Sequence, residues 1–422
     1  MRPEPSPALM NPLKNNRLLV LGLALFLLAA LAASAPADGL TSNDLYQQTL
    51  RSTAMVVVPN GDKASQGTGW LVDRERKLLV TNRHVVSGQK QILAIFPAFR
   101  DGKLITDRNY YLKEGIRFHG QVIESNLGHD LAVIQLDGLP SFVQPLKLAK
   151  ARPRAKESVL LVGNPGTSPT LWVQTSGTIQ AVSRDRIKVK FTDQELEARV
   201  EVLETQNPIR PGSSGGPVVM KNGEVIAVAA GVDKQTHVIG IDVSEVREIL
   251  SEVYQHEGLR HHNSGRFDLA VADYSAAIEL NASDARAFQC RGMSYKRLEK
   301  YQEAVADCTQ AVRLDPKNCR AYNERGAAHS FLDEYDLAIR DYTSAIRLKP
   351  DYALAYRNRG SCHALRGEWD DAISDYDTAI RLDNRDAKAF LKRSQAYAKL
   401  GDRVKSREDF DEAIQLDPSM KR

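Results

Sequence analysis

Three short motifs carry residue types that together can hydrolyse amide bonds. They are Val80-Thr-Asn-Arg-His84-Val-Val86, Gly128-His-Asp130-Leu-Ala-Val-Ile134 and Arg210-Pro-Gly212-Ser-Ser214-Gly-Gly-Pro-Val218. A serine hydroxyl is a poor nucleophile at neutral pH, so it needs a base within hydrogen-bonding reach, and histidine is the side chain most often used as that base. Each motif alone also fits a capping histidine, a strand-end aspartate or a flexible glycine-rich loop. Their occurrence in one chain favours nucleophilic catalysis.

The sequence around these motifs has the pattern of β-strands. Short apolar runs rich in β-branched residues recur between about residues 54 and 242, and Gly, Asn, Asp or Pro bounds each of them. Examples are 55–58, 131–136, 159–162 and 225–228. Few helical stretches separate these runs, so the pattern favours a β-barrel or a β-sandwich over a βαβ fold.

In the order His, Asp, Ser, the motifs resemble those of serine peptidases with the trypsin/chymotrypsin fold, most closely the HtrA-type branch. The segments Gly67-Thr-Gly-Trp-Leu-Val-Asp73, Gly163-Asn-Pro-Gly166 and Thr175-Ser-Gly-Thr-Ile179 also resemble segments of that branch. The resemblance covers about residues 43 to 250. It implies an all-β domain of two six-stranded barrels, chymotrypsin-like, with the active site between them.

The same resemblance implies a role for each motif. Ser214 would be the nucleophile, His84 would take its proton and return it to the leaving amine, and Asp130 would orient and stabilise the imidazole. The backbone N–H groups of Gly212 and Ser214 would form the oxyanion hole. Ser213 stands where the family more often has Asn, a change that keeps the nucleophile and both N–H donors.

A substrate pocket also follows from the resemblance. The residue six positions before the nucleophile is Pro208, and because it is not an acid, a requirement for Lys or Arg in the substrate is disfavoured. Ala229, Ala230 and Gly231 would line the pocket wall with small apolar groups. Small or medium aliphatic residues are therefore expected before the scissile bond.

After residue 253 the chain has a different period. Blocks that begin at Ala287, Ala321, Ala355 and Ala389 are spaced by 34 residues, with small residues at matching positions and proline after most blocks. This helix–turn–helix unit resembles the tetratricopeptide repeat, and the alternative is a generic helical bundle. The resemblance implies an all-α solenoid of five repeats, which are 253–286, 287–320, 321–354, 355–388 and 389–420.

Repeats of this kind stack into a superhelix whose concave face binds an extended peptide or a helix. By resemblance, the first helix of each repeat lines that face. Residues near the starts of these helices could receive acidic or C-terminal carboxylate groups: Arg286, Gln289, Arg320, Asn323 and Arg357. The alternative interpretation of these positions is a solvated helix face.

The N-terminal segment 1–37 has the three parts of a secretory signal. Basic residues precede an apolar run over 18–33, and Ala33-Ser34-Ala35 or Ala35-Pro36-Ala37 offers a cleavage site. The run is slightly shorter than the roughly 20 residues that a permanent membrane helix needs. The segment predicts export to the periplasm or cell envelope, and an uncleaved anchor, as the sole membrane contact, is the alternative.

Composition excludes several other classes of function. The chain has 422 residues, and 57 basic against 53 acidic residues leave a net charge of +4, so no strong field favours nucleic acid. No phosphate-binding P-loop motif is present, so proteolysis coupled to ATP has no support, and no cofactor or metal is expected. All four cysteines (Cys290, Cys308, Cys319 and Cys362) lie in the repeats. They are interpreted as small packing residues, with a Cys290–Cys308 bridge as the alternative.

These observations predict a multi-domain chain: a signal over 1–37, a trypsin-like serine protease domain over 42–252 and the repeats over 253–420. The predicted function is an exported, ATP-independent serine endopeptidase that cleaves proteins or peptides through an acyl-enzyme. Its repeats would recruit a substrate or a protein partner, or would mediate assembly into a homo-oligomer. The alternative function is a weak or inactive protein-interaction scaffold of the cell envelope.

Overall fold

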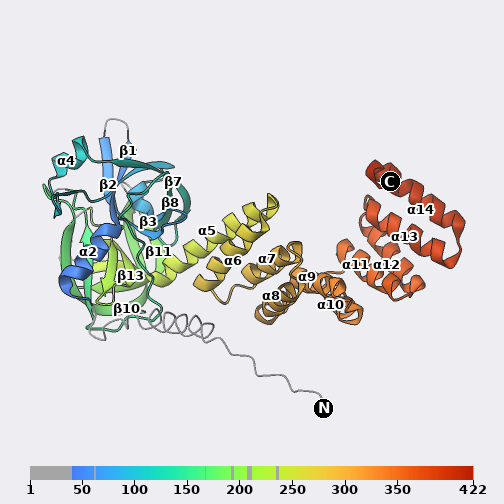
Figure 1. The fold of residues 1–422 in the computed structure, drawn as a ribbon. Helices are drawn as coiled ribbons and strands as arrows, with labels where there is room; N and C mark the ends of the chain where they lie inside the picture. The colour runs from blue at the N-terminus through green and yellow to red at the C-terminus, as the bar shows by residue number, and fades with distance from the viewer. Residues whose placement is uncertain are drawn as a thin grey trace, which may run out of the picture.

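The computed structural model describes residues 40–60, 63–166, 168–191, 194–206, 212–233 and 237–421. A β-rich domain comes first, and a row of helices then extends away from it (Figure 1). The predicted signal over 1–37 and the predicted pocket residue Pro208 lie outside the described residues. Among the residues that the structure describes, no helix combines the length and the apolar character needed to cross a membrane.

The first half of the β-rich domain is a closed antiparallel barrel with the strand order β1-β2-β3-β8-β7-β4. Its strands are β1 (Thr53–Asn60), β2 (Lys63–Asp73), β3 (Leu78–Asn82), β4 (Gln91–Ile95), β7 (Arg117–Asn126) and β8 (Leu131–Leu136). Helix α2 (Ser42–Ser52) precedes β1. Buried residues such as Val56, Leu79 and Ile134 form one apolar cluster, because alternate side chains of each strand point to the same face.

The second half is another closed antiparallel barrel, with the order β10-β11-β14-β13-β12-β9. Its strands are β9 (Ser158–Gly163), β10 (Val173–Phe191), β11 (Gln194–Thr205), β12 (Pro217–Met220), β13 (Val225–Asp233) and β14 (His237–Asp242). Leu161, Ile226 and Val238 belong to its core. A larger cluster that includes Trp70 and Trp172 joins residues of both barrels. The prediction of two six-stranded barrels is confirmed.

An insertion between β4 and β7 connects the two barrels. It consists of a small hairpin, β5 (Phe99–Arg100) and β6 (Lys103–Leu104), and of helix α4 (Arg108–Lys113). The Leu171 N–H of the second barrel donates to the Thr106 carbonyl at 2.9 Å. The buried Tyr111 ring packs edge-on against the Trp172 ring, with 5.5 Å between their centroids. The insertion therefore reaches the loop that precedes β10.

Within the described residues, helices α5 to α14 form five antiparallel pairs, and the predicted all-α array is confirmed. The pairs are α5 (Val243–Asn263) with α6 (Phe267–Leu280), α7 (Ala285–Arg297) with α8 (Tyr301–Leu314), α9 (Cys319–Phe331) with α10 (Tyr335–Leu348), α11 (Ala353–Leu365) with α12 (Trp369–Leu382), and α13 (Ala387–Leu400) with α14 (Arg403–Leu416). A Cβ at Gly326 would lie only 3.0 Å from the Tyr342 ring, so the small residue allows close packing. Helix α5 is continuous across the predicted domain boundary at 252/253.

The cysteines of the repeats are all free thiols, so the alternative of a Cys290–Cys308 bridge is wrong. Cys308 is buried between α7 and α8, where a Cβ at Gly292 would lie 2.9 Å from its sulfur. Burial raises the pKa of the Cys290 thiol. Cys308 and Cys362 are buried and pack as small apolar residues, as the sequence predicted, whereas Cys290 and Cys319 are only partly buried.

An arginine and an aspartate pair across the two helices of four successive repeats. These pairs are bidentate, with N–O distances of 2.7 or 2.8 Å: Arg291–Asp307, Arg325–Asp341, Arg359–Asp375 and Arg393–Asp409. The first repeat keeps the aspartate as Asp273 but has Glu257 at the arginine position. Arg76, in the turn between β2 and β3, supplies the guanidinium instead, and its Nη2 donates to Asp273 Oδ1 at 2.5 Å. The β-rich domain thus completes the first repeat.

Removal of the Arg76 side chain should loosen this junction. The Asp273 side chain is 1% exposed. In Arg76→Ala it loses its guanidinium partner and keeps only the contact with His261 Nδ1, which lies 2.6 Å from Asp273 Oδ2. The free energy of opening of α6, measured by amide hydrogen exchange, should fall by about 1–3 kcal/mol. Arg260, whose ion pair with Glu257 lies at the surface, provides the control. Arg260→Ala should change the free energy of opening of α6 by less than about 0.5 kcal/mol.

A second substitution tests whether Arg76 stands in for the missing arginine of the repeat. The double variant Arg76→Ala/Glu257→Arg places an arginine at the position that Arg291 and Arg325 occupy in the next two repeats. Exchange protection of α6 should then recover by at least half. If the double variant exchanges as fast as Arg76→Ala alone, Arg76 does not fill that role.

Candidate active site

His84 and Asp130 come from adjacent ends of the first barrel. His84 lies in the one-turn helix α3 (Arg83–Val86) directly after β3, and Asp130 lies in the turn before β8. His84 Nδ1 is 2.7 Å from Asp130 Oδ2, and the His84 backbone N–H donates to Oδ1 at 2.9 Å. Asp130 is 2% exposed, so its carboxylate is withdrawn from water and held by one residue through two contacts.

The backbone of Asp130 is held in a left-handed conformation, with φ of +50°. The Arg83 N–H donates to its carbonyl at 3.0 Å, and Asn82 Nδ2 donates to the same oxygen at 3.1 Å. Asp and Asn tolerate this conformation better than most residues. Residues 82 to 84, at the junction of β3 and α3, therefore hold Asp130 in place next to the imidazole.

Ser214 lies in a glycine-rich turn that leads into β12. Its Oγ donates weakly to the Ala230 carbonyl at 3.4 Å, and its own carbonyl accepts from the Thr68 N–H at 2.9 Å. Gly215 follows with φ of +86°, and a Cβ there would lie 1.9 Å from the Thr68 carbonyl oxygen. Only glycine fits this position, so the turn presses closely against strand β2.

The two parts of the site meet at the start of the Gly67–Asp73 motif. A Cβ at Gly67 would lie 2.6 Å from Val85, the residue after His84, and 3.2 Å from the Ser214 carbonyl oxygen. The structure thus brings His84 and Asp130 into direct contact and places Ser214 on the neighbouring turn. The site lies where the barrels meet, because β2 and α3 belong to the first barrel and the turn belongs to the second.

Thr68 is a functional candidate that the site predictions missed. Its side chain is fully buried, and its Oγ1 donates to the Gly212 carbonyl at 2.9 Å and accepts from the Asn164 N–H at 3.0 Å. One hydroxyl therefore joins the turn of Ser214 to the loop after β9. Its place within the Gly67–Asp73 motif marks Thr68 as a candidate in the sequence. Its role could not be predicted, because its hydrogen-bond partners lie 96 and 144 residues away.

The described part of the predicted substrate pocket lies beside Ser214. Ala229 and Ala230 are buried on β13, and Gly215 N–H donates to the Ala229 carbonyl at 2.7 Å. A Cβ at Gly231 would have no heavy atom within 4 Å, so there is open space next to this residue. The three predicted wall residues therefore form the strand that faces the serine turn.

The predicted groove residues of the repeats occupy different environments. Gln289 Oε1 accepts from Asn318, Asn323 Nδ2 donates to Glu324 at 3.2 Å, and Arg357 pairs with Asp386 at 2.6 Å. Asn323 and Arg357 both line a hollow of about 650 Å³, together with Lys296, Phe331 and Lys388. The structure brings these two predicted residues together, although both already have partners within the repeats.

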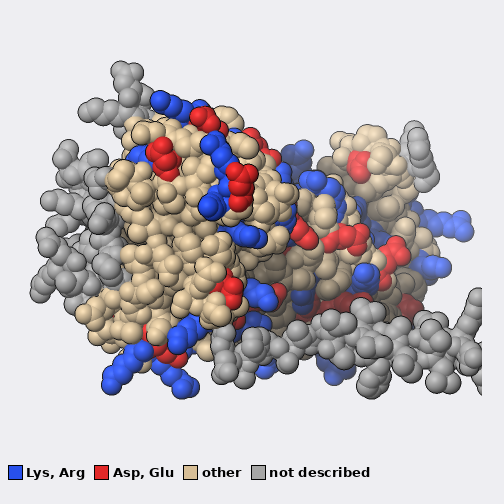
Figure 2. Space-filling view, turned by 60° about the vertical axis from the view of Figure 1, so that its left-hand side comes forward, with Lys and Arg blue, Asp and Glu red and all other residues tan. Residues whose placement is uncertain are grey.

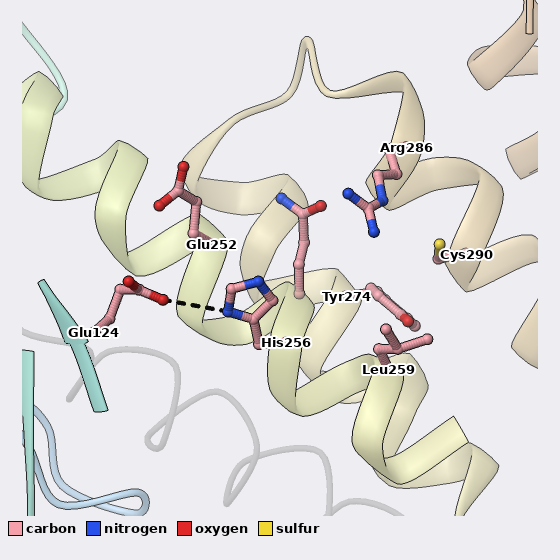
Figure 3. Close-up of a pocket in the computed structure, with 8 residues that line it drawn as sticks. Glu124, Glu252, His256, Leu259, Tyr274, Arg286 and Cys290 are labelled. Carbon is pink, nitrogen blue, oxygen red and sulfur yellow. Dashed lines mark ion pairs between the residues drawn. The ribbon is translucent and has the colours of Figure 1, made fainter. Parts of the chain in front are cut away.

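Arg286 lines a separate pocket at the junction of the domains (Figure 3). This cavity of about 250 Å³ lies between α5, α6, α7 and the end of β7. Glu252, His256 and Cys290 contribute to its wall, and His256 pairs with Glu124 at 3.3 Å. Burial, and then the negative charges of Glu124 and Glu248, raise the pKa of Glu252.

In the part of the chain that the structure describes, two groups of histidine and carboxylate side chains have ligand atoms within 4.8 Å of one another: His129 with Glu245 and Glu248, and His363 with Glu368 and Asp371. In each group the histidine already pairs with a glutamate, at 3.2 Å for His129–Glu245 and at 2.7 Å for His363–Glu368. Contacts between side chains of the fold therefore account for the histidine in both arrangements. On the face shown in Figure 2, Lys and Arg side chains are interspersed with Asp and Glu, in keeping with the net charge of +4.

Comparison with known families identifies both regions. The trypsin-like peptidase domain family matches residues 67–228. The tetratricopeptide repeat family matches residues 251–284, 285–318, 323–387 and 366–421. The predicted fusion of a trypsin-like peptidase domain with C-terminal tetratricopeptide repeats is therefore confirmed.

Individual relatives that match part of this chain are proteases by name. The putative serine protease HhoA of Synechocystis sp. is 29% identical over 183 residues, which are 43% of this chain and 40% of that protein. The periplasmic serine endoprotease DegP of Salmonella typhimurium is 27% identical over 164 residues, or 38% of this chain and 29% of that protein. The active form of the Rv3671c protease from M. tuberculosis covers 52% of this chain and 91% of its own, with 20% identity and a TM-score of 0.40. The chain spans less than half the length of HhoA and of DegP.

Proposed function

We propose that this chain, a trypsin-like peptidase domain followed by tetratricopeptide repeats, is a serine endopeptidase that cleaves protein substrates without ATP. The contact of His84 with the buried Asp130, beside the glycine turn that carries Ser214, is the observation that carries the proposal. The names of HhoA and DegP describe serine proteases, which supports the same class of reaction. His84, Asp130 and Ser214 are the proposed catalytic residues.

In this mechanism Asp130 sets the tautomer of His84. An ionised carboxylate can only accept hydrogen bonds, so the contact between Asp130 Oδ2 and His84 Nδ1 places the ring proton on Nδ1. The lone pair of Nε2 is then available to take the proton of Ser214. As the imidazole becomes positively charged, the adjacent carboxylate stabilises it without taking the proton itself.

Bond making then proceeds in two steps. Ser214 Oγ attacks the scissile carbonyl while Nε2 takes its proton, and the C=O electron pair moves onto the oxygen, where the N–H groups of Gly212 and Ser214 would stabilise it. Collapse of this intermediate breaks the C–N bond, and His84 gives its proton to the leaving amine. Water then attacks the acyl carbonyl while the same imidazole takes its proton. The bond between this carbon and Ser214 Oγ breaks, His84 returns the proton to Oγ, and the acid product leaves.

The repeats and the N-terminal segment extend the proposal. Tetratricopeptide repeats expose a concave surface that suits a protein or peptide, and the hollow lined by Phe331 and Lys388 offers apolar and basic contacts. We propose that this surface recruits a substrate or an adaptor. The composition of residues 1–37 supports export to the periplasm or cell envelope.

The purified chain should digest fluorescently labelled casein, and a fluorophosphonate should stop the digestion. Addition or removal of ATP should leave the rate unchanged, because the proposed steps use only the side chains and water. Stoichiometric binding of unfolded casein with no cleavage would contradict the proposed endopeptidase and would favour a protein-interaction scaffold instead.

A further inference from the structure

The guanidinium of Arg108, in the insertion that follows β4, contacts the loop after β9, and this loop contacts Gly212 of the serine turn. Arg108 is the first residue of α4 and is half-buried. Its Nε donates to the Ser168 carbonyl at 3.0 Å, one terminal nitrogen donates to Gln66 Oε1 at 2.8 Å, and the other donates to the Pro165 carbonyl at 2.6 Å. All three acceptors are neutral oxygens, and they belong to two segments, Gln66 on β2 and residues 165 and 168 after β9, that are far from Arg108 in the sequence.

These contacts hold one loop at two points. Pro165 and Ser168 belong to the loop that follows β9. The Arg108 backbone N–H also donates to the carbonyl of Pro169, the residue after Ser168, at 3.1 Å. Burial lowers the pKa of the guanidinium, since part of its hydration is lost in this position. A flexible loop held through two carbonyls by one planar fork loses much of its conformational freedom.

The other side of this loop supports Gly212. A Cβ at Gly212 would lie 2.3 Å from the Gly166 nitrogen and 2.6 Å from the Asn164 carbonyl oxygen, and the glycine itself has φ of +101°. The loop backbone and the Gly212 backbone are therefore in van der Waals contact. Gln66 reinforces the arrangement, because its Nε2 donates to the Asn164 carbonyl at 3.3 Å while its Oε1 accepts from Arg108.

We propose that Arg108 is a positioning residue for the oxyanion hole. It holds loop residues 164–166 and 168 against Gly212, and this support fixes the position of the Gly212 N–H that would face the developing oxyanion. The inference rests on the proposed function. The insertion of the first barrel thereby controls the geometry of a catalytic turn that belongs to the second barrel, and Arg108 acts without touching the substrate.

The test measures inactivation by a fluorophosphonate–rhodamine probe in the full chain. Attack of the serine on phosphorus develops negative charge on the phosphoryl oxygen, so a displaced oxyanion donor lowers the rate of the bonding step. In Arg108→Ala, kinact should fall about 10- to 100-fold, in line with the cost of small misplacements and of lost oxyanion donors. KI should stay within about threefold, and the final labelling stoichiometry should equal that of the wild type.

Two further variants and a rescue experiment make the test specific. Arg108→Lys should remain impaired, because one ammonium cannot span three acceptors, whereas millimolar guanidinium should restore part of kinact in Arg108→Ala but not in Arg108→Lys. Arg100→Ala is the matched control: Arg100 belongs to the same insertion, lies over the Tyr110 ring at 5.9 Å and should leave kinact unchanged.

The possible results distinguish failure of the proposed peptidase function from failure of the proposed role of Arg108. If the wild type does not react with the probe, the proposed function fails and the role of Arg108 fails with it. If the wild type reacts and Arg108→Ala has an unchanged kinact, the function stands and this inference is overturned. A lower labelling stoichiometry with an unchanged kinact also overturns it, because that result means that fewer molecules fold and that the folded ones have a normal site.

Discussion

Substitution of Ser214 by alanine should lower casein cleavage by at least about 10⁴-fold, because the acyl-enzyme cannot form without its hydroxyl. A residual rate above that of water is expected, since the oxyanion donors and the substrate contacts remain. The measurement is the initial rate with labelled casein, at matched protein concentration and with circular dichroism to verify folding.

Ser213 supplies the matched control for this experiment. It precedes Ser214 in the same turn and is 5% exposed, packed against Gly163, where an added Cβ would lie 2.7 Å from Ser213 Oγ. Ser213→Ala should keep activity within about tenfold, because the backbone N–H groups and the proposed nucleophile persist. Loss of activity in Ser213→Ala with retention in Ser214→Ala would exchange the two assignments.

Replacement of Asp130 by asparagine should lower the cleavage rate by about 10⁴-fold. The amide Nδ2 would face His84 Nδ1 as a donor and favour the opposite tautomer, and a neutral amide cannot stabilise the imidazolium. The fold should persist, because asparagine tolerates the φ of +50° and its Oδ1 can still accept from the His84 N–H.

The exposed Asp137, at the end of β8, provides a charge-matched comparison. Asp137→Asn removes the same charge from the same barrel and should change the rate by less than about twofold. A folded Asp130→Asn variant with activity within tenfold of the wild type would remove Asp130 from the mechanism. Loss of folding in that variant would instead show that the carboxylate is needed for the turn.

The elements that local patterns encode could be predicted from the sequence. The short β-branched runs indicate strands, and the order of the His84, Asp130 and Ser214 motifs indicates how two barrels could share a site. The 34-residue spacing of Ala287, Ala321 and the later blocks indicates the helical pairs. In each case the signal lies within a few residues, or in a period that repeats along the chain.

Contacts between distant segments could not be predicted in this way. The sequence shows that Glu257 stands at the repeat position that is arginine in the later repeats. Nothing nearby in the sequence indicates that Arg76, 197 residues before Asp273, supplies the guanidinium instead. Arg108 likewise lies in a segment without a motif, and its partners come from β2 and from the loop after β9. Such pairings depend on how two domains or two barrels pack, which no single-sequence pattern records.

The repeat groove shows a related limit. Helical periodicity places Gln289, Asn323 and Arg357 near the starts of first helices, but it does not show what faces them across the solenoid. In the structure Gln289 contacts Asn318 and Arg357 pairs with Asp386, each 29 residues further along the chain, whereas Asn323 contacts its own neighbour Glu324. Any ligand that binds these three residues must compete with contacts that the repeats already make.

The central claim is that Ser214 is an activated nucleophile. Its most direct test is reaction of the full chain with a fluorophosphonate probe, followed by proteolytic digestion and mass spectrometry to locate the adduct. The account predicts one adduct per chain, on Ser214, with strongly reduced labelling in His84→Ala. An adduct on another residue, or a folded chain that remains unlabelled, would contradict it.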